Sequence, residues 1–137
     1  MKMQPQLPSE NSGAGEITTA HDRLIFRLLA DPRKEEALQW LQGGHSDDIR
    51  ILGRFKTNLD SVKCVQRLYD AGALEVFTVH IRKKRTNKTR SVKLVVTLPC
   101  EPHQRALIFN WCETHGRSIG YTPNPDHGES HLYILLD

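Results

Sequence analysis

Two stretches decide the fold of this chain: Glu75-Val76-Phe77-Thr78-Val79-His80-Ile81 and Val92-Lys93-Leu94-Val95-Val96-Thr97-Leu98. Both are rich in β-branched and other apolar residues, and in each of them apolar side chains recur at every second position. A polar connection separates the two stretches. This pattern predicts two strands of an antiparallel hairpin.

The connection between these strands is strongly basic. It reads Arg82-Lys83-Lys84-Arg85-Thr86-Asn87-Lys88-Thr89-Arg90, and six of its nine residues are Lys or Arg. This charge indicates binding but shows no mechanism. A charged connection can also serve only solubility. The candidate anion-binding residues are Arg82, Lys83, Lys84, Arg85, Lys88, Arg90 and Lys93.

The charge of the chain is unevenly distributed. The net charge is +3, but residues 1–48 carry 5 basic and 8 acidic side chains, residues 49–98 carry 12 and 3, and residues 99–137 carry 2 and 5. The middle part therefore favours an anionic partner or a complementary association between unlike surfaces. Arg50 and Arg54 would extend the basic hairpin into a surface if they shared the sheet face opposite the helices.

The remaining pattern predicts a single α+β domain that follows a helical pair. Residues 1–18 read as a disordered tail, because they contain little apolar surface. Apolar spacing predicts two short helices within residues 19–44, the second capped by Asp31 and Pro32. These helices would cover the open sheet face or associate with a second copy of the chain.

Residues 49–137 form the main domain in this prediction. They give strand, helix, strand, strand, helix, strand, with a strand at residues 49–55, a helix capped by Thr57 or Asn58, a helix from Pro102 to about His115, and a last strand at residues 132–136. This succession resembles the ferredoxin-like βαββαβ sandwich, in which two helices cover an antiparallel sheet. A winged helix is the alternative, but it leaves the first and last strands without a role.

Two groups of residues could carry chemistry. Asp126, His127, Glu129 and His131 are weak candidates for a metal site or for proton transfer, although the same stretch has the composition of a tight turn. The pairs Cys100/His103 and Cys112/His115 have the spacing of zinc ligands, but a helix between the cysteines would separate them by ~18 Å. We therefore expect neither a metal nor another cofactor.

The sequence favours a non-enzymatic adaptor that presents the basic hairpin to a nucleic acid or to an acidic protein surface. Tyr133 is the one aromatic residue expected to face outward on the sheet, so sequence-specific stacking on bases is not predicted. Three cysteines without a secretory pattern, and no long apolar run, favour a cytoplasmic protein without a membrane contact.

Two alternatives remain open at this point. The first is a small regulatory or oligomerisation domain of ferredoxin-like fold that associates through the N-terminal helices or a sheet edge. The second is a metal-dependent hydrolase that uses Asp126, His127, Glu129 and His131.

Overall fold

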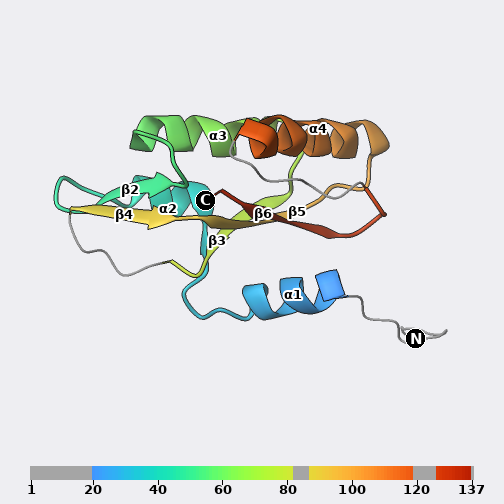
Figure 1. Ribbon diagram of the computed structural model, residues 1–137, viewed down its shortest axis with the longest axis horizontal. Coiled ribbons are helices and arrows are strands. Elements are labelled where there is room, and N and C mark those ends of the chain that lie inside the picture. The colour runs from blue at the N-terminus through green and yellow to red at the C-terminus, as the bar shows by residue number, and fades with distance from the viewer. Residues whose placement is uncertain (1–19, 82–86, 119–125, 137) are drawn as a thin grey trace.

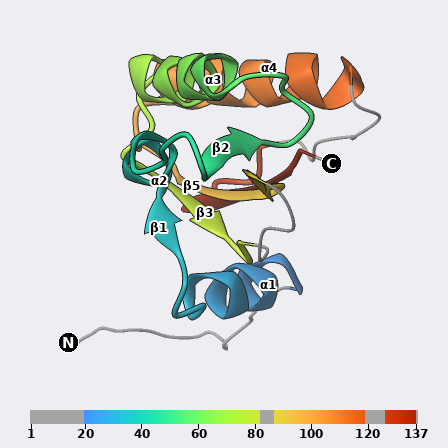
Figure 2. The ribbon, with the colours of Figure 1, turned by 90° about the vertical axis from the view of Figure 1, so that its left-hand side faces the viewer.

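The protein is a mixed α+β structure in three layers (Figures 1 and 2). The computed structural model describes residues 20–81, 87–118 and 126–136. The predicted tail at residues 1–18 therefore lies outside the described residues. The helices are α1 (Ala20–Leu29), α2 (Ala37–Gln42), α3 (Asn58–Asp70) and α4 (Pro102–Ser118). None of them, within these ranges, is long and apolar enough to cross a bilayer.

The strands form a four-stranded antiparallel sheet and a short parallel pair. The sheet has the order β1 (Glu35–Glu36), β3 (Glu75–Val79), β5 (Lys93–Thr97) and β6 (His131–Leu135), and the parallel pair consists of β2 (Ile49–Leu52) and β4 (Lys88–Ser91). Helices α3 and α4 lie on one face of the sheet, and α1 lies on the other (Figure 2). This arrangement confirms the predicted α+β class.

The hairpin is present, and a separate short strand precedes its second arm. Glu75 pairs with Thr97 and Val79 pairs with Lys93, so the two arms have the predicted antiparallel register. The residues Lys88 to Ser91, however, do not belong to a turn. They form β4, which pairs in parallel with β2 from Ile49 to Leu52. The turn between the two arms is thus shorter than the nine residues that the sequence suggested, because its last residues belong to β4.

A glycine marks the end of β2, which pairs only with β4 among the described strands. Gly53 has a φ of +50°, and a Cβ on it would lie 2.7 Å from both the Cβ and the carbonyl oxygen of Leu136. The amide of Gly53 donates to Ser91, and that of Leu136 donates to the neighbouring Val92. The ends of β2 and β6 thus meet on one side of the long β4–β5 segment. Since β6 occupies the position beside β5, β2 cannot continue along it.

Side chains from α3 seal the outer edge of β2. The buried Ser61 Oγ accepts a hydrogen bond from the Leu52 amide at 2.8 Å, and Asn58 Nδ2 donates to the Arg50 carbonyl at 2.7 Å. Helix α3 itself begins as predicted, because the Thr57 side chain caps it by accepting from the Asp60 amide. The cap therefore places both sealing residues in the first turn and a half of α3.

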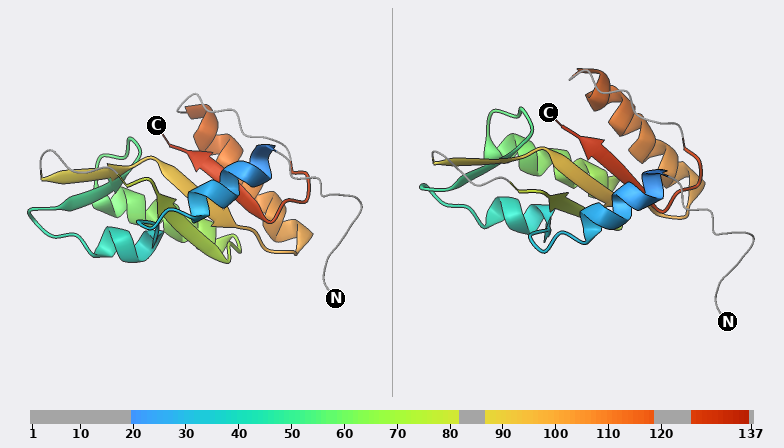
Figure 3. Two further views of the ribbon diagram at one scale, coloured as in Figure 1. Left: turned by 90° about the horizontal axis from the view of Figure 1, so that it is seen from below. Right: turned by 60° about the horizontal axis from the view of Figure 1, so that its bottom comes forward.

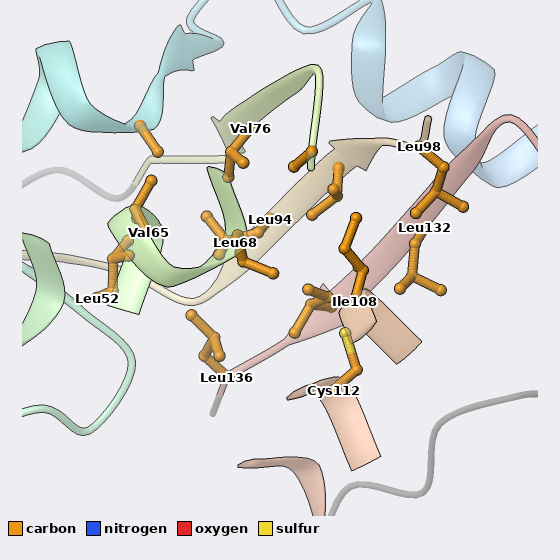
Figure 4. Packing of buried hydrophobic residues seen from close by; sticks show 14 of the residues in the cluster. Leu52, Val65, Leu68, Val76, Leu94, Leu98, Ile108, Cys112, Leu132 and Leu136 are labelled. Atoms are coloured by element: carbon orange, nitrogen blue, oxygen red, sulfur yellow. The ribbon is translucent and has the colours of Figure 1, made fainter. Parts of the chain in front are cut away.

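The main core lies between the sheet and the helices α2, α3 and α4. Figure 4 shows how side chains from α3, α4 and the strands converge there, and all of the labelled residues are buried. They include Val65 and Leu68 from α3, Ile108 and Cys112 from α4, and Leu94 from β5. Burial of such aliphatic side chains contributes about 1.5–3 kcal/mol each.

A smaller core lies on the opposite face, between the sheet and α1. Ile25 and Leu28 of α1 are buried against Val79 and Val95, and the helix crosses β5 and β6 (Figure 3). The two N-terminal helices thus lie on opposite faces, and α1 covers the face that the sequence left open. The predicted start of the second helix at Asp31 is wrong. Helix α2 begins five residues later than predicted, at Ala37 and not at Pro32, and is capped by the Glu36 carboxylate and not by Asp31.

Candidate anion-binding surface

The fold holds the chain on both sides of residues 82–86 of the basic connection. Before them, the His80 amide donates to Asp31 Oδ2 at 2.7 Å, and after them, the Asn87 carbonyl accepts from the Ile49 amide at 2.6 Å. His80 has a φ of +51°, which non-glycine residues seldom adopt and which turns the chain out of β3. Arg82, Lys83, Lys84 and Arg85 lie outside the described residues. The structure thus defines the two points between which they are attached.

Cationic groups gather around the first attachment point. Lys93 Nζ donates to His80 Nδ1 at 3.1 Å, which requires that this nitrogen carry no proton. Arg33 is exposed next to Asp31, and Lys34 Nζ lies 5.0 Å from the ring centroid of Phe77. The Arg33 and His80 amides donate to the Asp31 carboxylate and lower its pKa. We call Arg33, Lys34, His80 and Lys93 the α1-side basic cluster.

The two basic residues of β4 lie near the second attachment point. Lys88 and Arg90 are exposed, whereas Thr89 and Ser91 are buried. The Ser91 hydroxyl is hydrogen bonded to that of Thr78, on the side of the main core. Because side chains alternate along a strand, Lys88 and Arg90 lie on the opposite face, where α1 packs.

Arg90 also fixes a loop that carries two further cations. Its Nη1 donates to the carbonyl oxygens of Gly53 at 2.8 Å and of Phe55 at 3.1 Å. Arg54 and Lys56 belong to this loop, and both are exposed without an ion pair among the described residues. Arg90 therefore positions neighbouring charges, in addition to any contact of its own.

Arg50 does not belong to this surface. Its guanidinium stacks over Trp40 of α2, with 5.6 Å to the ring centroid, and donates to the Trp40 carbonyl and to Asp48. The prediction that Arg50 shares a face with Lys93 is thus wrong, because β2 turns Arg50 toward the main core.

The predicted exposed aromatic residue is largely covered. Val95 of β5 pairs with Phe77 on β3 and with Tyr133 on β6. All three side chains belong to the small core between the sheet and α1. Phe77 was not predicted to lie on this face. Because α1 packs on this row of side chains, an open stacking platform for bases is not formed there.

The two carboxylates of the predicted C-terminal group, Asp126 and Glu129, form ion pairs with Arg105. Its Nη2 lies 2.7 Å from Asp126 Oδ1 and 3.5 Å from Glu129 Oε1. The hydrogen bond from Arg105 lowers the pKa of Asp126 to about 2. The backbone amide of His127 donates to Glu129, and the His131 carbonyl accepts from His21 Nε2. Arg105 thus ties this segment to α4.

These four residues do not meet around one point. Among the described residues, no group of three or more His, Cys, Asp or Glu side chains could hold a metal ion.

The three cysteines differ in their exposure. Cys100 is exposed, whereas burial raises the pKa of Cys64 and of Cys112 to about 12. Helix α4 is continuous from Pro102 to Ser118. Helical residues therefore separate Cys100 from Cys112, as their spacing predicted.

Sequence reasoning missed the contribution of residues that precede the hairpin. Arg33 and Lys34 follow α1 and reach the hairpin only because β1 pairs with β3, with Glu35 opposite Thr78. Two consecutive glutamates carry no strand signal, so the sequence offered no evidence for this pairing. Comparison with protein-family models, curated proteins and solved structures finds no match for this chain.

Proposed function

We propose that this protein is a non-enzymatic binding module that presents its basic connection to an anionic partner, either a nucleic acid or an acidic protein surface. The observation that carries the proposal is the attachment of this connection at His80 and Asn87. A loop that is attached to a fixed scaffold at both ends can place its charges toward one partner. Clustered Lys and Arg side chains bind phosphates and acidic surfaces through this charge.

The described basic residues around the connection extend the proposed surface. The α1-side basic cluster lies at one end, and Lys88, Arg90 and the loop with Arg54 and Lys56 lie at the other. Asp31 is the acidic residue inside the first group, and its carboxylate is occupied by two backbone amides. The proposed contact is with backbone phosphates or carboxylates, because α1 covers the aromatic side chains that could read bases.

The finer fold assignment is also a proposal. The succession β2, α3, β3, β4–β5, α4 and β6, together with the parallel pairing of β2 and β4, supports a variant of the ferredoxin-like sandwich. The variation is local: β6 bonds directly to β5, and β2 ends at Gly53.

Two double variants with the same loss of charge test the proposed function. Lys83→Ala/Lys84→Ala removes two charges from the connection, and Lys63→Ala/Arg67→Ala removes two exposed charges from α3, on the other side of the sheet. Affinity for a short DNA duplex is measured at several salt concentrations by fluorescence anisotropy, with poly-glutamate as the acidic protein mimic. The connection variant should bind more weakly and reduce the salt slope by up to about 2 for duplex DNA.

The control variant should bind as the unmodified protein does. Equal losses in both variants would mean that only net charge matters and would refute a located surface. Binding of neither polymer by the unmodified protein at low salt would refute the proposal as a whole.

A further inference from the structure

A cavity of about 280 Å3 lies apart from the basic surface. It is formed by the end of α2, the turn that follows, the start of β2 and the first residue of α3. Leu41 and Ile49 give it apolar walls, and its polar lining includes Arg50, His45, Ser46 and Asn58. The cavity is close to the lower end of the size range of small-molecule sites.

The guanidinium of Arg50 is held in one orientation beside this cavity. Its Nε donates to Asp48 Oδ2 at 3.1 Å, its Nη1 donates to the Trp40 carbonyl at 2.9 Å, and its Cζ lies over the Trp40 ring, 5.6 Å from the centroid. A guanidinium has five N–H groups in a fixed fork. The other three, on Nη1 and Nη2, have no acceptor among the described residues. An immobilised fork of this kind suits bidentate binding of an oxyanion.

The neighbouring polar groups complement such a ligand. His45 Nδ1 accepts from the Asp47 amide at 3.2 Å, so the neutral ring carries its proton on Nε2 and can donate it. Asn58 gives both of its N–H groups to carbonyls, those of Leu41 and Arg50, and keeps its oxygen as an acceptor. The cavity therefore combines donors for an oxyanion with one acceptor for a hydroxyl group.

We propose that this cavity binds a small organic oxyanion, a carboxylate or a phosphate monoester, with Arg50 as its bidentate partner. The carboxylate of Asp48 offsets the charge of Arg50, so directional hydrogen bonds hold the ligand more than net charge does. The apolar walls accommodate a short carbon chain. This inference is independent of the proposed macromolecular partner, because Arg50 lies on the other face of β2 from the basic surface.

NMR titration of the 15N-labelled full chain tests this site. The probes are inorganic phosphate and butyrate, each added at constant ionic strength against chloride. We expect saturable shifts of the Gly44, Ser46 and Asn58 amides and of Arg50 Nε with one common dissociation constant. Arg50→Lys keeps the charge but loses the fork and should bind about tenfold more weakly. Arg67→Lys, at an exposed position on α3 away from the cavity, is the matched control and should bind as the unmodified protein does.

A second variant covers the case in which Arg50→Lys disturbs the fold, which the Trp40 indole signal would report. His45→Gln leaves the contacts of Arg50 in place and should also weaken binding. Shifts that do not saturate, that match those caused by chloride, or that centre on Arg54 and Lys56 would overturn the proposal. Unchanged affinity in a folded Arg50→Lys protein would overturn it as well.

Discussion

Ser61→Ala tests how α3 is joined to the parallel strand pair. Ser61 is fully buried, accepts from the Leu52 amide at 2.8 Å and donates to the Thr57 carbonyl at 3.2 Å. The substitution leaves the buried Leu52 N–H without an acceptor, which costs about 1–3 kcal/mol. The better helix propensity of alanine returns up to about 0.5 kcal/mol. We therefore expect a net loss of about 0.5–3 kcal/mol in the free energy of unfolding.

Urea unfolding, followed by circular dichroism, measures this loss. With an m-value of about 1–3 kcal/mol/M, the midpoint should fall by roughly 0.2–3 M. Ser46→Ala is the control, because Ser46 is exposed and forms no hydrogen bond among the described residues. The amide of Leu52 should also exchange faster with deuterium in the Ser61 variant. If Ser61→Ala were as stable as Ser46→Ala, the edge of β2 would not be sealed by α3.

Three further predictions concern other parts of the chain. Gly53→Ala should lower the free energy of unfolding by at least about 1–2 kcal/mol in urea titrations, because Gly53 has a positive φ. Contact of the new Cβ with Leu136 should add to this loss. If the variant were fully stable, β2 would not end as described. Because the folded pKa of Asp126 is about 2, below its usual 3.8, this carboxylate stabilises the fold above pH 4, and its contribution should disappear between pH 4 and 2. In Arg105→Met, NMR titration should show a higher pKa for Asp126, and an unchanged value would contradict the ion pair. With an aromatic disulfide reagent at pH 8, Cys100 should react at once and the two buried cysteines only on unfolding; a second fast thiol would contradict this burial.

The sequence was sufficient for features that depend on local pattern. The alternation in Glu75–Val79 and Lys93–Thr97 predicted the hairpin arms, and their register agrees with it. Thr57 is of a residue type that often caps helices, and it caps α3 in the structure. Such features could be predicted because one short stretch contains both the signal and the structure.

Features that depend on competition between distant segments could not be predicted. β4 continues into the basic connection because β2 is available as a partner, although Lys, Thr and Arg have no common strand pattern there. Arg50 alternates with Ile49 and Ile51 as an outward residue would, yet Trp40 and Asp48 hold it on the core side. The C-terminal segment reads as a metal half-site until Arg105, more than twenty residues earlier, is placed between its carboxylates.

The salt dependence of nucleic acid binding tests the central proposal most directly. Unmodified protein is titrated into a short labelled DNA duplex and into its single strand at two salt concentrations. The proposal predicts micromolar or tighter binding at low salt that falls steeply as salt is raised, with a steeper slope for the duplex. Binding that does not change with salt, or no binding of nucleic acid and of poly-glutamate at low salt, would contradict the account of the basic connection as a binding surface.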